Sequence, residues 1–185
     1  MKTTLIRSFL CTALLSAGLW LTFASAPVTR ANNDKRAPEL PSPLCDSVEV
    51  PAGHKVAYHV YAKGVQIYRW DGASWKFVAP EADLFADAEF HGKVGRHYAG
   101  PTWESNAFSK VIGSRVGACT PDATAIAWLK LKAVTTTGPG IFHKVTFIQR
   151  VNTVGGLAPT TPGTTADEIA EVPYTTEYYF YRAEN

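Results

Sequence analysis

The stretch of the chain that decides its fold reads AIAWLKLKAV at residues 125–134 and IFHKVTFIQRV at residues 141–151, with TGPG at residues 137–140 between them. Both segments are rich in β-branched and aromatic residues, which are typical of strands. The glycines and the proline between them supply turn chemistry. We therefore predict an antiparallel hairpin over these residues.

The faces of this hairpin carry two further predictions. In the second segment Gln149 shares a face with Phe147 and Val151. If that face is buried, the amide must find hydrogen-bond partners or cost about 1–3 kcal/mol. In the first segment Trp128 and Leu129 are both large and apolar although they point to opposite faces. This change of phase predicts a bulge near Trp128.

Similar short segments fill the rest of the chain from residue 46 onward, and none has an apolar stripe of helical period longer than two turns. We expect strands at residues 55–61, 64–70 and 74–78, with turns at residues 62–64 and 71–72. The predicted fold is all-β: an antiparallel β-sandwich or a small barrel of about eight strands, with minor helical turns.

The C-terminal segment at residues 175–182 contains YYFY, which is apolar on both faces and therefore predicts a strand covered on two sides. The best helix start is Thr165-x-x-Glu168, a capping-box pattern that predicts a helical turn or two before Pro173.

The N-terminus has the order of a secretory signal: Lys2 and Arg7, then an apolar run without charges, then small residues. The alternative is an uncleaved membrane anchor, because the run approaches the roughly 20 residues that span a bilayer. We predict a secreted or periplasmic protein composed of a signal peptide (1–31), a flexible proline-containing leader (32–45) and one β-rich domain (46–185).

Charge excludes two classes of partner. Removing residues 1–31 takes away three of the 18 basic residues and none of the 16 acidic ones, which leaves 15 against 16. A near-neutral chain neutralises few phosphates, so we expect no nucleic acid partner and, after signal cleavage, no membrane partner. Cys45 and Cys119 would remain after cleavage, and in an oxidising compartment they either pair or stay separate buried thiols.

Several motifs occur in one order along the chain: GVQIYR at residues 64–69, VGRHYAGPTWE at 94–104, IAWL at 126–129, TFIQRVNTVGGLAP at 146–159 and VPY at 172–174. Over residues 48–182 the chain resembles DUF3455, a family of secreted proteins of unknown function. The resemblance implies a cysteine pair that is absent here, because Trp70 and the region of Gly163 and Thr164 carry no cysteine. Ala107-Phe108-Ser109 also replaces the family's Asp-Gly-Ser, so a tight turn is less expected there.

The best candidate site lies between residues 89 and 104, where polar and aromatic side chains crowd between glycines, as in a binding loop on a rigid scaffold. Its candidate ligand-binding residues are His97, Tyr98, Trp103 and Glu104. The alternative is that His97 and Trp103 are core residues whose ring nitrogens bond to the backbone.

A second candidate cluster comprises Gln149, Arg150 and Asn152. The planar guanidinium of Arg150 is suited to a carboxylate ligand. The alternative is that Arg150 forms an ion pair with an acid such as Glu177, while the two amides satisfy a strand end.

Sites for other chemistry are weaker. Glu89, His91 and His97 have the same parity, but glycines interrupt the strand between them, so we predict no metal site. The chain has no GxSxG nucleophile motif and no GxGxxG nucleotide motif, so we predict no cofactor.

The leading hypothesis is an exported, non-catalytic module that binds a small molecule, glycan or envelope component. The alternatives are a hydrolytic or metal-assisted enzyme that uses His97 with Glu104, and a structural envelope or matrix protein.

Overall fold

The computed structural model describes residues 36–184, in which eight strands and one short 3-10 turn form. The signal peptide predicted at residues 1–31 and the first part of the predicted leader lie outside the described residues. The elements are η1 (Asp46–Val48), β1 (His54–Trp70), β2 (Trp75–Phe85), β3 (Lys93–Tyr98), β4 (Thr102–Ser105), β5 (Lys110–Cys119), β6 (Trp128–Thr137), β7 (Phe147–Gly155) and β8 (Ile169–Ala183).

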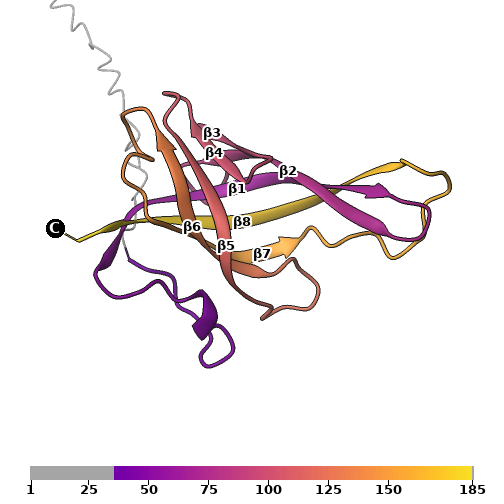
Figure 1. The fold of residues 1–185 in the computed structure, drawn as a ribbon, viewed down its shortest axis with the longest axis horizontal. Helices are drawn as coiled ribbons and strands as arrows, with labels where there is room; N and C mark the ends of the chain where they lie inside the picture. The colour runs from indigo at the N-terminus through magenta and orange to yellow at the C-terminus, as the bar shows by residue number, and fades with distance from the viewer. Residues whose placement is uncertain (1–35, 185) are drawn as a thin grey trace, which may run out of the picture. The chain divides into compact units, whose positions relative to one another are not determined.

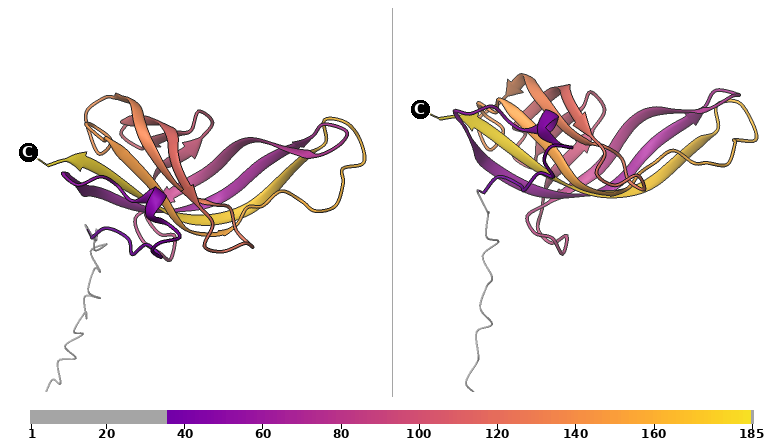
Figure 2. Two further views of the ribbon diagram at one scale, coloured as in Figure 1. Left: turned by 60° about the horizontal axis from the view of Figure 1, so that its bottom comes forward. Right: turned by 90° about the horizontal axis from the view of Figure 1, so that it is seen from below.

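The eight strands close into one antiparallel barrel in which every strand pairs with its neighbours in sequence and β8 pairs back to β1 (Figure 1). Closure gives every strand a partner on each side, although residues 75–81 of β2 and 169–173 of β8 pair with β1 alone. The all-β prediction is confirmed, and of the two architectures left open the chain adopts the barrel. β1, β2 and β8 are the longest strands and run beyond the others as a curved arm (Figures 1 and 2).

The turn predicted at residues 62–64 is wrong, because β1 continues through it without interruption. Gly64 pairs with β2, and a Cβ atom added to it would lie 2.1 Å from the carbonyl oxygen of Glu81. The glycine therefore permits close approach of two strands rather than a reversal of the chain. The turn at residues 71–72 does form, and the Asp71 carboxylate accepts hydrogen bonds from two backbone amides within it.

The hairpin of β6 and β7 forms as predicted, but β7 begins at Phe147. The preceding residues turn and bring Phe142 and Val145 into the barrel core. The bulge predicted near Trp128 is wrong, because the register between β5 and β6 is regular at that residue. Trp128 faces outward and is nevertheless buried, since a second apolar layer covers it.

The helical turn predicted from Thr165-x-x-Glu168 is also wrong. The Glu168 carboxylate does accept a hydrogen bond from the Thr164 amide at 2.6 Å, but the residues form only a bend and a turn before β8 begins. Pro173 lies inside β8, where its partner in β1 is Val65. The local capping pattern is therefore present, but the long strand follows immediately.

The described chain has one apolar cluster inside the barrel and another on its outer face. In β8, Tyr178 and Phe180 belong to the inner cluster, whereas Tyr179 and Tyr181 belong to the outer one. The N-terminal segment, residues 36–50, covers the outer cluster with side chains that include Val48 (Figure 2). The prediction that this strand is buried on both faces is confirmed.

A disulfide between Cys45 and Cys119 joins this N-terminal segment to the end of β5, with the two Cα atoms 5.2 Å apart. The two residues are 74 positions apart in sequence. In the loop-entropy model, closing a loop of that length stabilises the folded state by about 4 kcal/mol. Cys45 is fully buried, so this end of the predicted leader is part of the packed structure.

Candidate ligand-binding cavity

The barrel interior contains a cavity of about 580 Å³, and every one of the eight strands contributes to its wall. This volume lies within the range of small-molecule sites, about 300–1,000 Å³. The strand residues that line it are Gln66, Tyr68, Phe77, Val78, Pro80, His97, Trp103, Arg115, Leu129, Leu131, Arg150 and Tyr178. Three residues that the sequence singled out, His97, Trp103 and Arg150, therefore meet in one concavity.

His97 and Trp103 face each other across β3 and β4. Their rings stack at a centroid distance of 4.4 Å, and the Tyr178 ring meets both edge-on. The Nδ1 atom of His97 lies 2.9 Å from the carbonyl oxygen of Thr102. A carbonyl can only accept, so Nδ1 carries the proton and donates. Burial lowers the pKa of His97 to about 3, so the ring is neutral at physiological pH.

Arg150 extends from β7 to the cavity wall, where its Nε and Nη2 atoms donate to the Ala127 carbonyl at 3.1 and 2.8 Å. Within residues 36–184 no carboxylate forms an ion pair with it. The alternative pairing with Glu177 is wrong, because Glu177 binds His59 at 2.8 Å and Asn152 at 2.8 Å. Arg150 therefore brings a positive charge to the cavity without a protein counterion in this part of the chain.

Three polar groups in the cavity wall have no hydrogen-bond partner among the described residues: Gln66 Nε2, Trp103 Nε1 and the Tyr178 hydroxyl. Each of these residues is at most 2% exposed. Tyr174 lies close to Gln66 and Tyr178, but the contacts do not reach hydrogen-bond geometry. An unpartnered buried polar group costs about 1–3 kcal/mol, so each of these three residues carries a group that the described part of the chain leaves unsatisfied.

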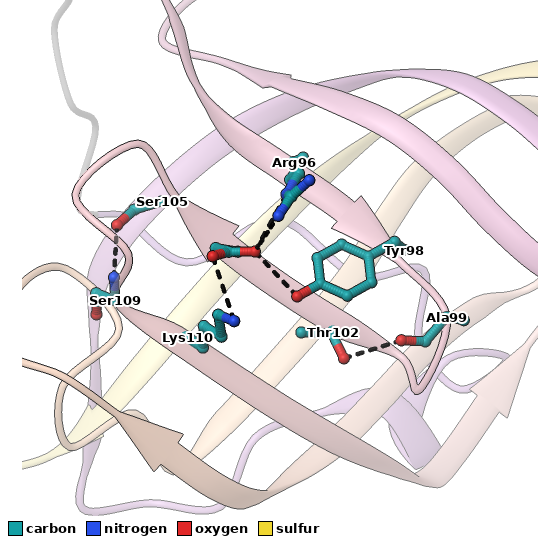
Figure 3. Close-up of polar contacts among 8 residues, drawn as sticks. Arg96, Tyr98, Ala99, Thr102, Ser105, Ser109 and Lys110 are labelled. Atoms are coloured by element: carbon teal, nitrogen blue, oxygen red, sulfur yellow. Dashed lines mark hydrogen bonds and ion pairs between the residues drawn. The ribbon is translucent and has the colours of Figure 1, made fainter.

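Tyr98 and Glu104, the other two candidates from this hairpin, lie on its outer face. Figure 3 shows Arg96, Tyr98 and Lys110 converging on a carboxylate, that of Glu104, at 2.8, 3.0 and 3.3 Å. The hydrogen bonds, above all the one from Arg96, hold the pKa of Glu104 below its usual value. We call these four residues the Glu104 cluster.

Alternation along β3 and β4 places the Glu104 cluster on the opposite side of the sheet from His97. A catalytic pair must lie within hydrogen-bond reach of a shared substrate. This arrangement separates His97 from Glu104 and so gives no support to an enzyme that uses the two together.

Gln149 and Asn152 also lie away from the cavity. Gln149 points to the outer face, where its Nε2 donates to the Val48 carbonyl at 2.7 Å and its Oε1 accepts from the Tyr181 hydroxyl. This buried amide thus has the partners that the sequence required. Asn152 is exposed and donates to Glu177. Both amides support the packing of outer elements.

The three residues considered for a metal are divided between two places. Glu89 and His91 lie with Asp87 in the connection between β2 and β3, and their potential ligand atoms are within 4.8 Å of one another. His97 is buried in the barrel instead. Exposed groups of this kind are common without a metal, and the prediction of no metal site is left as a prediction.

The sequence did not point to several residues of the cavity wall, chiefly Gln66, Tyr68 and Arg115. A signal for Gln66 was available, because it is a polar residue between Val65 and Ile67 in a strand-like segment. The Tyr68 hydroxyl donates to the Gly156 carbonyl at 2.6 Å. This contact joins β1 to the loop after β7, and no local pattern predicts it.

The fold and this cavity define the class of protein: an eight-stranded antiparallel barrel with an internal cavity of ligand size. The chain belongs to DUF3455, a family described as protein of unknown function, whose model matches residues 51–182. No curated protein and no solved structure matches the chain. Over the described residues there is no helix with the length and apolar character needed to cross a membrane.

The structure explains what replaces the family features that this chain lacks. Trp70 and Gly163 are in contact, since a Cβ atom added to Gly163 would lie 2.6 Å from Cγ of Trp70. An indole packed on a glycine therefore stands near the place where the resemblance implied a cysteine pair. The tight turn before β5 also forms, and Phe108 adopts a positive φ of 62° in it.

Proposed function

We propose that the protein is an exported, non-catalytic binding module that holds a small molecule inside its barrel. One observation carries the proposal: His97, Trp103 and Arg150 come from three strands and line one cavity. Three residues of the same wall, Gln66, Trp103 and Tyr178, each carry a buried polar atom without a partner among the described residues. Buried donors around a mainly apolar concavity are the usual composition of a small-molecule site. Among the ligand classes considered, a cavity of about 580 Å³ within the barrel favours a small molecule over a glycan chain.

Export is the second part of this proposal. It rests on the N-terminal order of basic, apolar and small residues. The Cys45–Cys119 disulfide is compatible with it, because disulfides persist in oxidising compartments.

A thermal-shift screen of small molecules tests the binding function. A ligand at 100 times its Kd adds about 2.7 kcal/mol of stability, which corresponds to a rise in Tm of roughly 5–10 °C for a domain of this size. The variant Leu129→Trp would fill the cavity, because Leu129 lines it. The matched control is Val134→Trp on the same strand, where the side chain is 65% exposed.

We expect compounds that raise the Tm of the wild type to act equally on Val134→Trp and to have no effect on Leu129→Trp. Compounds that stabilise all three proteins alike bind outside the barrel and would contradict the proposal. A broad screen with no stabilising compound would contradict it as well.

A further inference from the structure

We propose that the ligand is an apolar molecule with a single carboxylate, and that Arg150 binds this carboxylate. This inference deepens the proposed function and rests on it. Three properties of the cavity wall support it independently: the sign of its charge, its unpartnered hydrogen-bond donors and the mainly apolar character of its exposed lining.

The charge of the cavity wall is positive. Arg115 and Arg150 both line it, whereas none of the aspartates and glutamates among the described residues does. His97 contributes no charge near neutral pH, because burial keeps its ring neutral. Of the two arginines, Arg150 is the more enclosed, since it is half-buried and Arg115 is exposed. A half-buried cation without a counterion among residues 36–184 favours an anion as its partner.

Two of the three unpartnered polar atoms that the described wall carries are donors only. The same wall also holds an acceptor, Nε2 of the neutral His97 ring, and the Tyr178 hydroxyl can donate or accept. Gln66 Nε2 and Trp103 Nε1 can only donate, and neither has a partner in the described chain. Arg150 offers further N–H groups besides those directed at Ala127. A carboxylate has two oxygens that only accept, so it can satisfy several of these donors at once. An alcohol brings a single oxygen and a protonated amine brings no acceptor, so each satisfies fewer of these donors than a carboxylate does.

The exposed part of the cavity lining is mainly apolar, with Arg115 as its charged residue. Phe77 and Val78 line the cavity and remain 54% and 52% exposed. Phe77 and Val78 are consecutive, and consecutive residues of a regular strand point to opposite faces. Here both reach the same opening, because Val78 is the extra residue of a bulge between β1 and β2. Leu157 lines the cavity from another element and is 42% exposed. Large apolar side chains left in water around a cavity are suited to the hydrocarbon part of a ligand.

Isothermal titration calorimetry with three probes of equal chain length tests the inference: dodecanoate, 1-dodecanol and dodecyltrimethylammonium, all below their aggregation concentrations. We expect dodecanoate to bind at least 10-fold more tightly than 1-dodecanol, and the cation to bind most weakly. The loss of a hydrogen-bonded charge pair corresponds to roughly a 10- to 100-fold change in Kd.

The variant Arg150→Gln should lower the affinity for dodecanoate to that for 1-dodecanol and leave the affinity for 1-dodecanol unchanged. Arg69→Gln is the control, because Arg69 is exposed on β1 and pairs with Asp167 outside the cavity. Arg150→Lys keeps the charge without the planar fork, so it should keep part of the preference. The Tm of each variant, measured without probe, shows whether it has folded.

The outcomes distinguish this inference from the proposed function. If dodecanoate and 1-dodecanol bind equally well and Arg150→Gln changes neither affinity, the inference of a carboxylate ligand is overturned. The proposed function then remains, as a binding module for neutral apolar molecules. Failure of all three probes, together with uncharged hits in the thermal-shift screen, would overturn the inference in the same way. Failure of the probes and of the screen would overturn both.

Discussion

The two faces of the β3–β4 hairpin carry similar side chains in opposite situations. On the outer face, Glu104 receives hydrogen bonds or ion pairs from Arg96, Tyr98 and Lys110 (Figure 3). On the inner face, the indole N–H of the adjacent Trp103 is buried and lacks a partner within the described residues. The Trp103 residue is part of the cavity wall. Polar groups paired within the protein serve the fold, whereas unpaired groups around a cavity indicate a ligand.

This comparison separates two kinds of variant. Changes in the outer layer should alter the free energy of unfolding and leave ligand affinity unchanged. Changes in the cavity wall should alter ligand affinity most. The predictions below test this separation, from the largest expected effect to the smallest.

The double variant Cys45→Ala/Cys119→Ala should have the largest effect. Removing this disulfide, whose cysteines are 74 positions apart, should lower the free energy of unfolding by about 4 kcal/mol, because the unfolded chain regains conformational freedom. Denaturant unfolding measures the loss, and titration with a cavity ligand below the Tm should give an unchanged Kd. A loss below about 1 kcal/mol would show that the N-terminal layer is held mainly by its apolar contacts.

Acid should destabilise the protein through His97. Its pKa falls from an ordinary value near 6.5 when unfolded to about 3 when folded, so the unfolded state binds the extra proton first. The contribution of the neutral His97 ring to stability is therefore fully present above pH 6.5. Below pH 6.5 the free energy of unfolding falls by up to about 1.4 kcal/mol per pH unit, and the total loss at pH 5 is about 2 kcal/mol.

The pH window identifies the group. The pKa of Glu104 is lowered, so its contribution is present above its unfolded pKa of about 4.5 and is lost only as the pH falls through its folded value. Between pH 5 and 6.5 the loss therefore reports His97. Unfolding free energies of the wild type and of His97→Phe, which keeps an aromatic ring, should diverge in slope there. Equal slopes would contradict a neutral buried His97.

The variant Phe108→Gly should slightly raise the free energy of unfolding. Phe108 has a φ of 62° and is 76% exposed, so the backbone strain is relieved with little loss of buried area. We expect the free energy of unfolding to rise by about 1 kcal/mol. Ala107→Gly in the same turn is the control, because no positive φ occurs at that residue. Ligand affinity should not change in either variant, and an unchanged or lower stability of Phe108→Gly would show that the ring contributes more than the strain costs.

The predictability of the fold varied from segment to segment. YYFY at residues 178–181 predicted a strand buried on both faces because all four side chains are apolar, and both faces are covered. Gly64 was misread as a turn because glycine also permits close contact between strands, and sequence alone does not distinguish the two uses. The phase change at Trp128 suggested a bulge because the covering layer on the outer face comes from residues far away in sequence.

The candidate site was predictable in part for a similar reason. Strand alternation places His97 and Trp103 on one face of the hairpin and Tyr98 and Glu104 on the other. Each face, however, carries both a polar and an aromatic residue. Nothing local indicates which set faces the interior. Arg150 was singled out from the sequence and does line the cavity, but the absence of a pairing with Glu177 depends on His59 and Asn152, which bind that acid elsewhere.

By itself, the sequence determined an all-β domain, because strand periodicity and turn chemistry are properties of neighbouring residues. Only the tertiary structure decided that eight strands close into a barrel, that the N-terminal segment covers one face, and that Gln66, Trp103 and Arg150 surround one cavity. These features depend on contacts between residues more than 100 positions apart, such as Gln149 with Val48. Barrel closure brings such residues together, and no local pattern encodes it.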